Sequence, residues 1–167
     1  MTVNVSEAAR VASRIPRPAR VSLRAGVRVH RVRCVLSDGR HFLLVQNNAR
    51  RPENHGKWSL PGGRLRTREQ PRVGLRRELV EELGFRVPHL VDVGDWWHSD
   101  EYHRIFGCEI APTELSLEND EILAYAWLDY ADVKELSVAG QVRWGFELEA
   151  ISAFRRLPSD VRGVGTA

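Results

Sequence analysis

Apolar and polar residues alternate along much of this chain, and the pattern predicts strands separated by turns. Between residues 21 and 35, Val27, Val29 and Val32 alternate with Arg and His, as in strands with one solvated face. The Asp38-Gly39 pair suits a hairpin turn, because glycine readily adopts positive φ. Further strands are predicted at residues 42–45, 58–60, 90–97, 102–110 and 121–128.

Three helical segments are predicted from apolar residues at helical spacing. The first begins at Pro71, which is favoured at a first helical position, with Thr67 or Gln70 as its cap. It ends near Leu83, because Gly84 suits the left-handed residue that follows a helix. A short helix or turn is predicted at 130–136, and an amphipathic helix at 142–157. The apolar stripe of the last helix is formed by Trp144, Leu148, Ile151 and Phe154.

These elements fit one domain, which we place at residues 21–158 of the 167-residue chain. Residues 1–20 are rich in Arg and Ala with Glu7 as their one acid, so we expect a flexible tail. A eukaryotic transit peptide is the alternative. Residues 159–167 are predicted as a second tail.

Composition excludes several classes of protein. Hydrophobic residues make up 43% and charged residues 28% of the chain, as in globular proteins, and no apolar run is long enough to span a membrane. The net charge of +3 is too small to predict stable binding to nucleic acid. Cys34 and Cys108 lie in apolar runs, so we expect buried, reduced thiols in a cytoplasmic protein.

A Gly-rich turn followed by an acidic helix is the most distinctive stretch. Gly62 and Gly63 precede a helix that carries Glu78, Glu81 and Glu82. Like charges at helical spacing repel each other, so a bound divalent cation would stabilise this arrangement. Carboxylates one turn apart can reach one Mg²⁺ ion, and the turn can add a backbone carbonyl. A solvated acidic helix face is the alternative, but the Gly-rich turn in front favours a metal site.

The same stretch resembles the signature of the Nudix hydrolase superfamily, which is Gly, five residues, Glu, seven residues, and Arg-Glu-aliphatic-x-Glu-Glu-x-Gly-aliphatic. The matching positions are Gly63, Glu69, Arg77, Glu78, Leu79, Glu81, Glu82 and Gly84. Phe85 stands in the last aliphatic position, where it affects packing and not catalysis. The resemblance implies an α/β (α+β) fold, a Nudix-like α/β/α sandwich with a mixed β-sheet and a catalytic loop-helix.

The resemblance also implies an activity, which is hydrolysis of a nucleoside diphosphate linked to another moiety. Water would attack phosphorus with the help of Mg²⁺ or Mn²⁺. Glu78 and Glu82 are implied as the main metal ligands, Glu81 as a further ligand or a base, and the carbonyl of Gly62 as the last ligand. The residues implied to support the site are Gly63, Glu69 and Arg77.

The resemblance also implies a base outside the signature, in the loop before the last strand. Glu121 fits this place best and Glu118 second, with plain surface charge as the alternative for both. Loop cations and strand aromatics are the candidates for substrate binding, although an aromatic residue in a strand is also a common core residue. These candidates are Arg51, Trp58, Arg64, Trp97 and Tyr102.

Two other functions stay open on the sequence. A module that binds a nucleotide without hydrolysing it could use the same fold, although the intact acidic signature argues against it. An isopentenyl-type isomerase would need a catalytic Cys, and neither cysteine stands in such a context. We expect a small nucleotide or diphosphate substrate as the partner, and a homodimer if the Trp144 stripe is exposed.

Overall fold

The computed structural model describes residues 17–111, 113–117 and 120–163. The strands are β1 (Ala19–Val21), β2 (Arg31–Ser37), β3 (Phe42–Asn47), β4 (Trp58–Ser59), β5 (Val91–His98), β6 (Glu101–Glu109) and β7 (Ile122–Leu128). The helices are a 3-10 turn, η1 (Pro52–Asn54), and α2 (Pro71–Leu83), α3 (Tyr130–Val138), α4 (Glu147–Arg155) and α5 (Ser159–Arg162). The predicted strands and helices are therefore present with shifts of their ends, except that Val27 and Val29 lie in the non-strand segment between β1 and β2.

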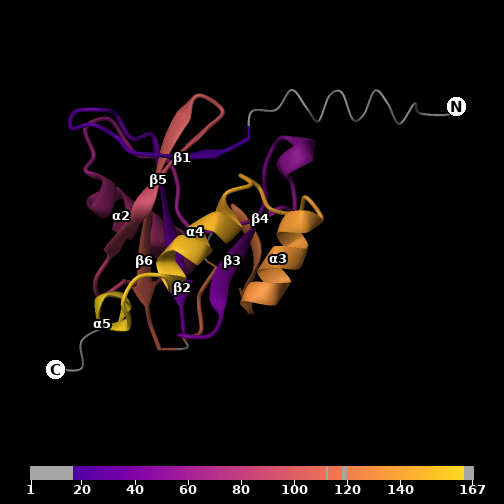
Figure 1. Ribbon diagram of the computed structural model, residues 1–167. Coiled ribbons are helices and arrows are strands. Elements are labelled where there is room, and N and C mark those ends of the chain that lie inside the picture. The colour runs from indigo at the N-terminus through magenta and orange to yellow at the C-terminus, as the bar shows by residue number, and fades with distance from the viewer. Residues whose placement is uncertain (1–16, 112, 118–119, 164–167) are drawn as a thin grey trace, which may run out of the picture.

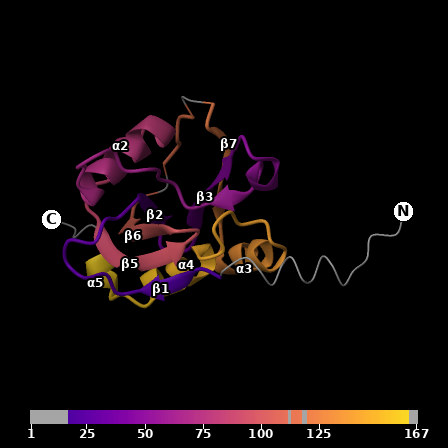
Figure 2. The same cartoon turned by 90° about the horizontal axis from the view of Figure 1, so that it is seen from above.

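All strands belong to one mixed seven-stranded sheet in the order β1-β5-β6-β2-β3-β4, with β7 on β3. The parallel pair is β2 with β6, and the other pairs are antiparallel. Helix α2 covers one face of the sheet, while α3 and α4 cover the other (Figures 1 and 2). The predicted α/β/α sandwich with a mixed sheet is thus confirmed.

Two apolar cores hold these layers together, one on each face of the sheet. Alternate residues of β2 point to opposite faces, because side chains alternate along a strand. Val32 and Cys34 pack into the core under α2, together with Leu75 and Leu79 of that helix. Val35 packs into the other core, which the residues of α4 and its neighbours complete. The second core includes Phe146, Ala150, Ile151 and Phe154.

Strands β2 and β3 diverge after a short contact, and this gap positions the functional site. Their pairing is confined to Ser37 and Phe42. The chain at residues 58–65 fills the gap, since β4 pairs with β3 while the next residues bond to β2. Val32 N donates to Gly63 O at 3.0 Å, and Cys34 N donates to Pro61 O at 2.9 Å. The Gly-rich turn is therefore held as part of the sheet.

Two boundaries of the domain differ from those predicted. Ala19 pairs with Trp97 in β1, so the sheet begins before residue 21. The segment after residue 158 forms α5, where Arg162 makes an ion pair with Glu109 at 2.8 Å, and is not a plain tail. Residues 1–16 and 164–167 of the two predicted tails lie outside the described residues.

The predicted helix at 142–157 begins only at Glu147, and the residues of its apolar stripe are buried or partly buried. Ile151 and Phe154 are fully buried against the sheet, because α4 needs its apolar side for the core. Trp144 precedes the helix and packs among charged side chains. The stripe therefore gives no support to a homodimer, which stays a prediction.

Cys34 and Cys108 are buried, unpaired thiols on the adjacent strands β2 and β6, as the sequence predicts. Burial raises the pKa of both thiols. Within the described residues, none of the helices is long and apolar enough to cross a membrane.

Packing of α4 on β6 gives a test of the fold. A Cβ at Gly107 would collide with the Phe154 ring, so we expect Gly107→Ala to lower the free energy of unfolding by about 1–3 kcal/mol. Gly163→Ala is the matched control, because its φ of −82° is ordinary and its Cβ would lie 3.4 Å from its nearest neighbour. Urea denaturation of both variants measures the difference. Equal stability of the two variants would contradict this packing.

Candidate active site

Helix α2 presents the three glutamates of the signature, and local signals fix its ends. Pro71 occupies the first turn and Gln70 the N-cap position, where its side chain makes no capping hydrogen bond. Gly84 adopts the left-handed conformation at φ 63° and donates its N–H to the carbonyl of Val80 at 3.0 Å. This is the predicted C-terminal glycine.

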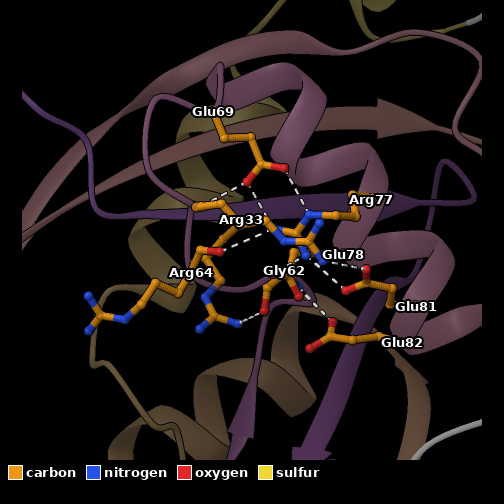
Figure 3. Close-up of polar contacts among 9 residues, drawn as sticks. Arg33, Gly62, Arg64, Glu69, Arg77, Glu78, Glu81 and Glu82 are labelled. Carbon is orange, nitrogen blue, oxygen red and sulfur yellow. Dashed lines mark hydrogen bonds and ion pairs between the residues drawn. The ribbon is translucent and has the colours of Figure 1, made fainter.

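Arg77 is the centre of the ion pairs on α2 (Figure 3). Its Nε and Nη2 donate to the two oxygens of Glu69, at 2.8 and 2.9 Å. Its Nη1 donates to Glu78 Oε1 and to Glu81 Oε2, both at 2.8 Å. The hydrogen bonds from Arg77 hold the pKa of Glu69 down to about 2, so this carboxylate is ionised throughout the physiological range. Arg77 thus braces the loop and neutralises part of the acidic cluster.

Glu82 of α2 forms a hydrogen bond with the Gly-rich turn. It is 6% exposed, and its Oε2 accepts the N–H of Gly62 at 2.9 Å. Burial raises the pKa of Glu82 to about 7 and also raises the pKa of Glu78. Both carboxylates therefore have a strong electrostatic tendency to bind a cation or a proton.

Close approach of the backbone requires glycine at position 62, while glycine at position 63 leaves room for a side chain of α2. Gly62 has φ 129°, and a Cβ there would collide with the carbonyl oxygen of Val32. A Cβ at Gly63 would collide with the carboxylate of Glu78. The turn can therefore lie directly between β2 and the acids of α2.

A pocket of about 670 Å³ lies at this turn and is lined by acidic and basic side chains from several elements. Glu78, Glu81 and Glu82 line it from α2, and Glu121 lines it from the segment before β7. Asn48 N donates to Glu121 O at 2.8 Å, which ties that segment to the end of β3. Glu118 lies outside the described residues.

Three pocket arginines reach the site from the face of the sheet opposite α2, and the sequence did not indicate them. Arg31 and Arg33 share the β2 face of Val35, and Arg143 precedes α4. Arg33 is 2% exposed, and its Nη1 donates to the carbonyls of Gly62 and, at 3.3 Å, Leu60. Alternation with valines predicted a solvated face for Arg31 and Arg33, because the divergence of β2 from β3 is invisible in the local pattern.

Of the residues predicted to bind substrate, Arg64 lines the pocket and the other four lie elsewhere. Trp58 packs against the core under α4, and Arg51 is exposed beside η1. Trp97 and Tyr102 pack on each other with ring centroids 4.8 Å apart. Aromatic residues in these strands are therefore used for packing.

The donors at the turn fit a hard divalent cation by their chemistry. Carboxylate oxygens and a carbonyl oxygen are the ligands that Mg²⁺ prefers. However, the described residues contain no group of three or more His, Cys, Asp or Glu side chains already placed around one point. Arg77 holds Glu78 and Glu81, and Arg33 donates to the carbonyl of Gly62. These side chains would have to turn toward a cation to bind it.

Comparison with known families identifies the domain. Residues 27–146 match the family model of the NUDIX domain, which spans most of the chain. The chain belongs to the Nudix hydrolase superfamily. The signature inferred from the sequence, the sandwich and the acid-lined turn agree with this assignment.

Two named relatives of this Nudix protein act on nucleotides according to their names. Putative 8-oxo-dGTP diphosphatase 2 of Mycobacterium tuberculosis is 49% identical over 53 residues, which cover 32% of this chain and 37% of the relative. The chain thus matches little more than a third of that protein. Nucleoside triphosphatase NudI of Klebsiella pneumoniae is 29% identical over 119 residues, which cover 62% of this chain and 83% of NudI.

Solved structures of other Nudix proteins share the fold. The MutT protein from Methanosarcina mazei superposes with a TM-score of 0.63 at 19% identity, over 77% of this chain and 96% of that one. The NUDIX domain of Shewanella oneidensis NrtR, solved with ADP ribose, gives 0.62 at 18% identity over 93% and 97%. At such identities the likeness concerns the fold alone.

Glu147, buried behind the pocket of this Nudix domain, should make the stability of the fold depend on pH. Burial raises its pKa to about 7 from 4.5, so between these values the folded state holds a proton that the unfolded state has lost. Its contribution to stability, about 3 kcal/mol, is present below pH 4.5 and lost as the pH rises to 7. We expect stability to fall less steeply with pH over this range in Glu147→Gln than in the parent. Glu82 and Glu78, whose pKa values burial also raises, act in the same direction as Glu147, and buried His103, whose pKa burial lowers, acts in the opposite one.

Urea denaturation at pH 5, 6, 7 and 8 measures this effect. Glu149→Gln is the control, because Glu149 is exposed on the same helix, and its pH dependence should equal that of the parent. If Glu147→Gln also keeps the full pH dependence, the assignment of this slope to Glu147 is wrong.

Proposed function

We propose that the protein is a Mg²⁺-dependent hydrolase that cleaves a diphosphate bond by attack of water on phosphorus. The substrate class is a nucleoside triphosphate or another nucleoside diphosphate linked to a further moiety. The observation that carries the proposal is the pocket at the Gly-rich turn, where the acids of α2 and Glu121 meet. Names of two relatives, an 8-oxo-dGTP diphosphatase and a nucleoside triphosphatase, support this class.

The metal ion would be held by Glu78, Glu82 and the carbonyl of Gly62, with Glu81 as a further ligand. Bound there, Mg²⁺ or Mn²⁺ would screen the phosphate charge and stabilise the leaving phosphate oxygen. Glu121 would accept a proton from the attacking water, since it lines the same pocket from the opposite side of the gap. Glu81 and Glu118 remain the other candidates for this base.

Supporting residues fix these groups. Arg77 and Glu69 hold the loop against α2, and Glu82 orients the Gly62 amide. The absence of a side chain at Gly63 leaves space for the carboxylate of Glu78. Fixed groups of this kind lower the cost of assembling the reacting atoms.

The other two functions have less support. A nucleotide-binding module without activity could share this fold, and one structural neighbour was solved with ADP ribose bound. However, this chain keeps every acid of the signature. An isomerase with a catalytic Cys has no support in the pocket, because Cys34 and Cys108 are fully buried in the sheet.

Removal of the metal ligands tests the proposal. We expect Glu78→Gln and Glu82→Gln each to lower Mg²⁺-dependent phosphate release at least 100-fold, since a neutral amide is a poor ligand for Mg²⁺. Turnover is measured against a panel of nucleoside triphosphates, dinucleoside polyphosphates, nucleotide sugars and ADP-ribose. Mn²⁺ binding by calorimetry is the second readout. A double variant with full activity would refute the proposed site.

Identification of the base needs separate variants. We expect Glu121→Gln to lower kcat by 10²–10⁴-fold with little change in Mn²⁺ affinity, because a general base contributes to the chemical step. Glu114→Gln, at an exposed position of the preceding loop, is the control. Full activity in both Glu121→Gln and Glu118→Gln would rule out both as the base and leave Glu81.

A further inference from the structure

Three arginine side chains lie over the ring of one tryptophan next to the pocket. The Cζ atoms of Arg31, Arg33 and Arg143 lie 5.1, 5.3 and 4.7 Å from the centroid of the Trp144 ring. All three arginines also line the pocket that contains the acids of α2. The aromatic face stabilises the guanidinium groups but cannot cancel their charge. The cluster therefore keeps three like charges beside the site.

The carboxylates next to this arginine cluster neutralise only part of its positive charge. Arg31 Nε pairs with Glu101 at 2.5 Å, but Glu101 is shared with Arg64. Glu147 lies behind the cluster, where its Oε1 accepts the N–H of Trp144 and its buried Oε2 has no hydrogen-bond partner. An additional anion bound at the cluster would therefore be favoured electrostatically.

The orientation of the arginines also suits a ligand. Asn47 Oδ1 accepts Nη1 of Arg143 at 3.0 Å, which holds this guanidinium at the end of β3. The buried Nε atoms of Arg33 and Arg143 have no partner within the protein. Burial, and then the charges of Glu82, Arg31 and Arg143, set the pKa of Arg33 at about 10, so it stays charged at neutral pH.

We propose that Arg31 and Arg143, backed by Arg33, form a subsite for a third phosphate of the substrate. This inference rests on the proposed function, in which the acids of α2 and their cation hold the scissile diphosphate. Arg31 and Arg143 are partly exposed and contact the anion, whereas Arg33 is a positioning residue that acts through its charge and its bond to the Gly62 carbonyl. Arginine suits this role because its planar donors match phosphate oxygens.

The subsite has a consequence for specificity. Among the described residues, no aromatic side chain lines the pocket, and Trp144 is covered by guanidinium groups. The pocket thus offers charges and amides to a phosphate chain but no stacking surface to a base. We expect the enzyme to distinguish substrates by the number of their phosphates more than by their base.

Binding of inorganic tripolyphosphate and pyrophosphate tests the subsite without turnover. Calorimetry at constant ionic strength, with Mg²⁺ present to hold the diphosphate at the acids, compares the parent with Arg143→Gln and Arg31→Gln. We expect the parent to bind tripolyphosphate at least tenfold more tightly than pyrophosphate. Each variant should lose about tenfold for tripolyphosphate and less than threefold for pyrophosphate.

Arg40→Gln is the matched control, because Arg40 is exposed in the hairpin between β2 and β3 and loses the same charge. It should bind both anions like the parent. Equal losses for both anions in the pocket variants, or an equal loss in Arg40→Gln, would overturn the subsite. If Arg143→Gln fails to fold in a thermal melt, Arg31→Gln decides alone.

Kinetics with Mg²⁺ separate this inference from the proposed function. We expect Arg143→Gln to raise KM about tenfold for ATP and less than threefold for ADP, with kcat within threefold for both. Exchange of adenine for uracil in the parent should change KM less than threefold. A larger effect of the base than of the third phosphate would overturn the inference. Absence of hydrolysis for every substrate would instead refute the proposed function, and tripolyphosphate binding would still test the subsite.

Discussion

The site depends on one close approach, that of the Gly62 backbone to strand β2. Hydrogen bonds from Val32 and Cys34 place the turn in the gap that opens between β2 and β3. The N–H of Gly62 donates to Glu82, and the carbonyl of Gly62 accepts from Arg33. One peptide segment therefore links residues from both sides of the sheet. A side chain at this position would push the turn away from β2 and separate these partners.

The gap also explains why so many charges are buried in a small domain. Glu82 comes from the α2 side and Arg33 and Glu147 from the α4 side, and all three are nearly or completely inaccessible to solvent. Burial of charges is unfavourable unless they are paired and hydrogen-bonded, and Glu147 is only partly satisfied. The apolar cores on both faces of the sheet must therefore offset the unfavourable free energy of burying these charged groups. Such local cost is typical of sites that are shaped for a ligand.

The sequence predicted the parts of this structure that local signals determine. Pro71 and Gly84 define the ends of α2, and the spacing of its acids places them on adjoining turns, so both follow from the chain alone. Arg33 and Arg143 could not be predicted, because they meet only through the divergence of two strands and the return of the chain before α4. Trp58 and Trp144 show the same limit. Their ring types suggested substrate stacking or an exposed stripe, while their surroundings are decided by long-range packing.

The separation of charge across the gap has an effect on the first encounter with a ligand. Acids line the pocket from α2 and from the segment before β7. Three arginines line it from β2 and from the segment before α4, and Arg50 and Arg64 line it from two loops. The pocket therefore carries an electric field directed from the arginine cluster to the acids. The proposed ligand, a phosphate chain with a cation near one end, is itself a dipole that this field would turn while the ligand is still in solvent. The direction in which such a ligand enters is thus selected before any hydrogen bond forms.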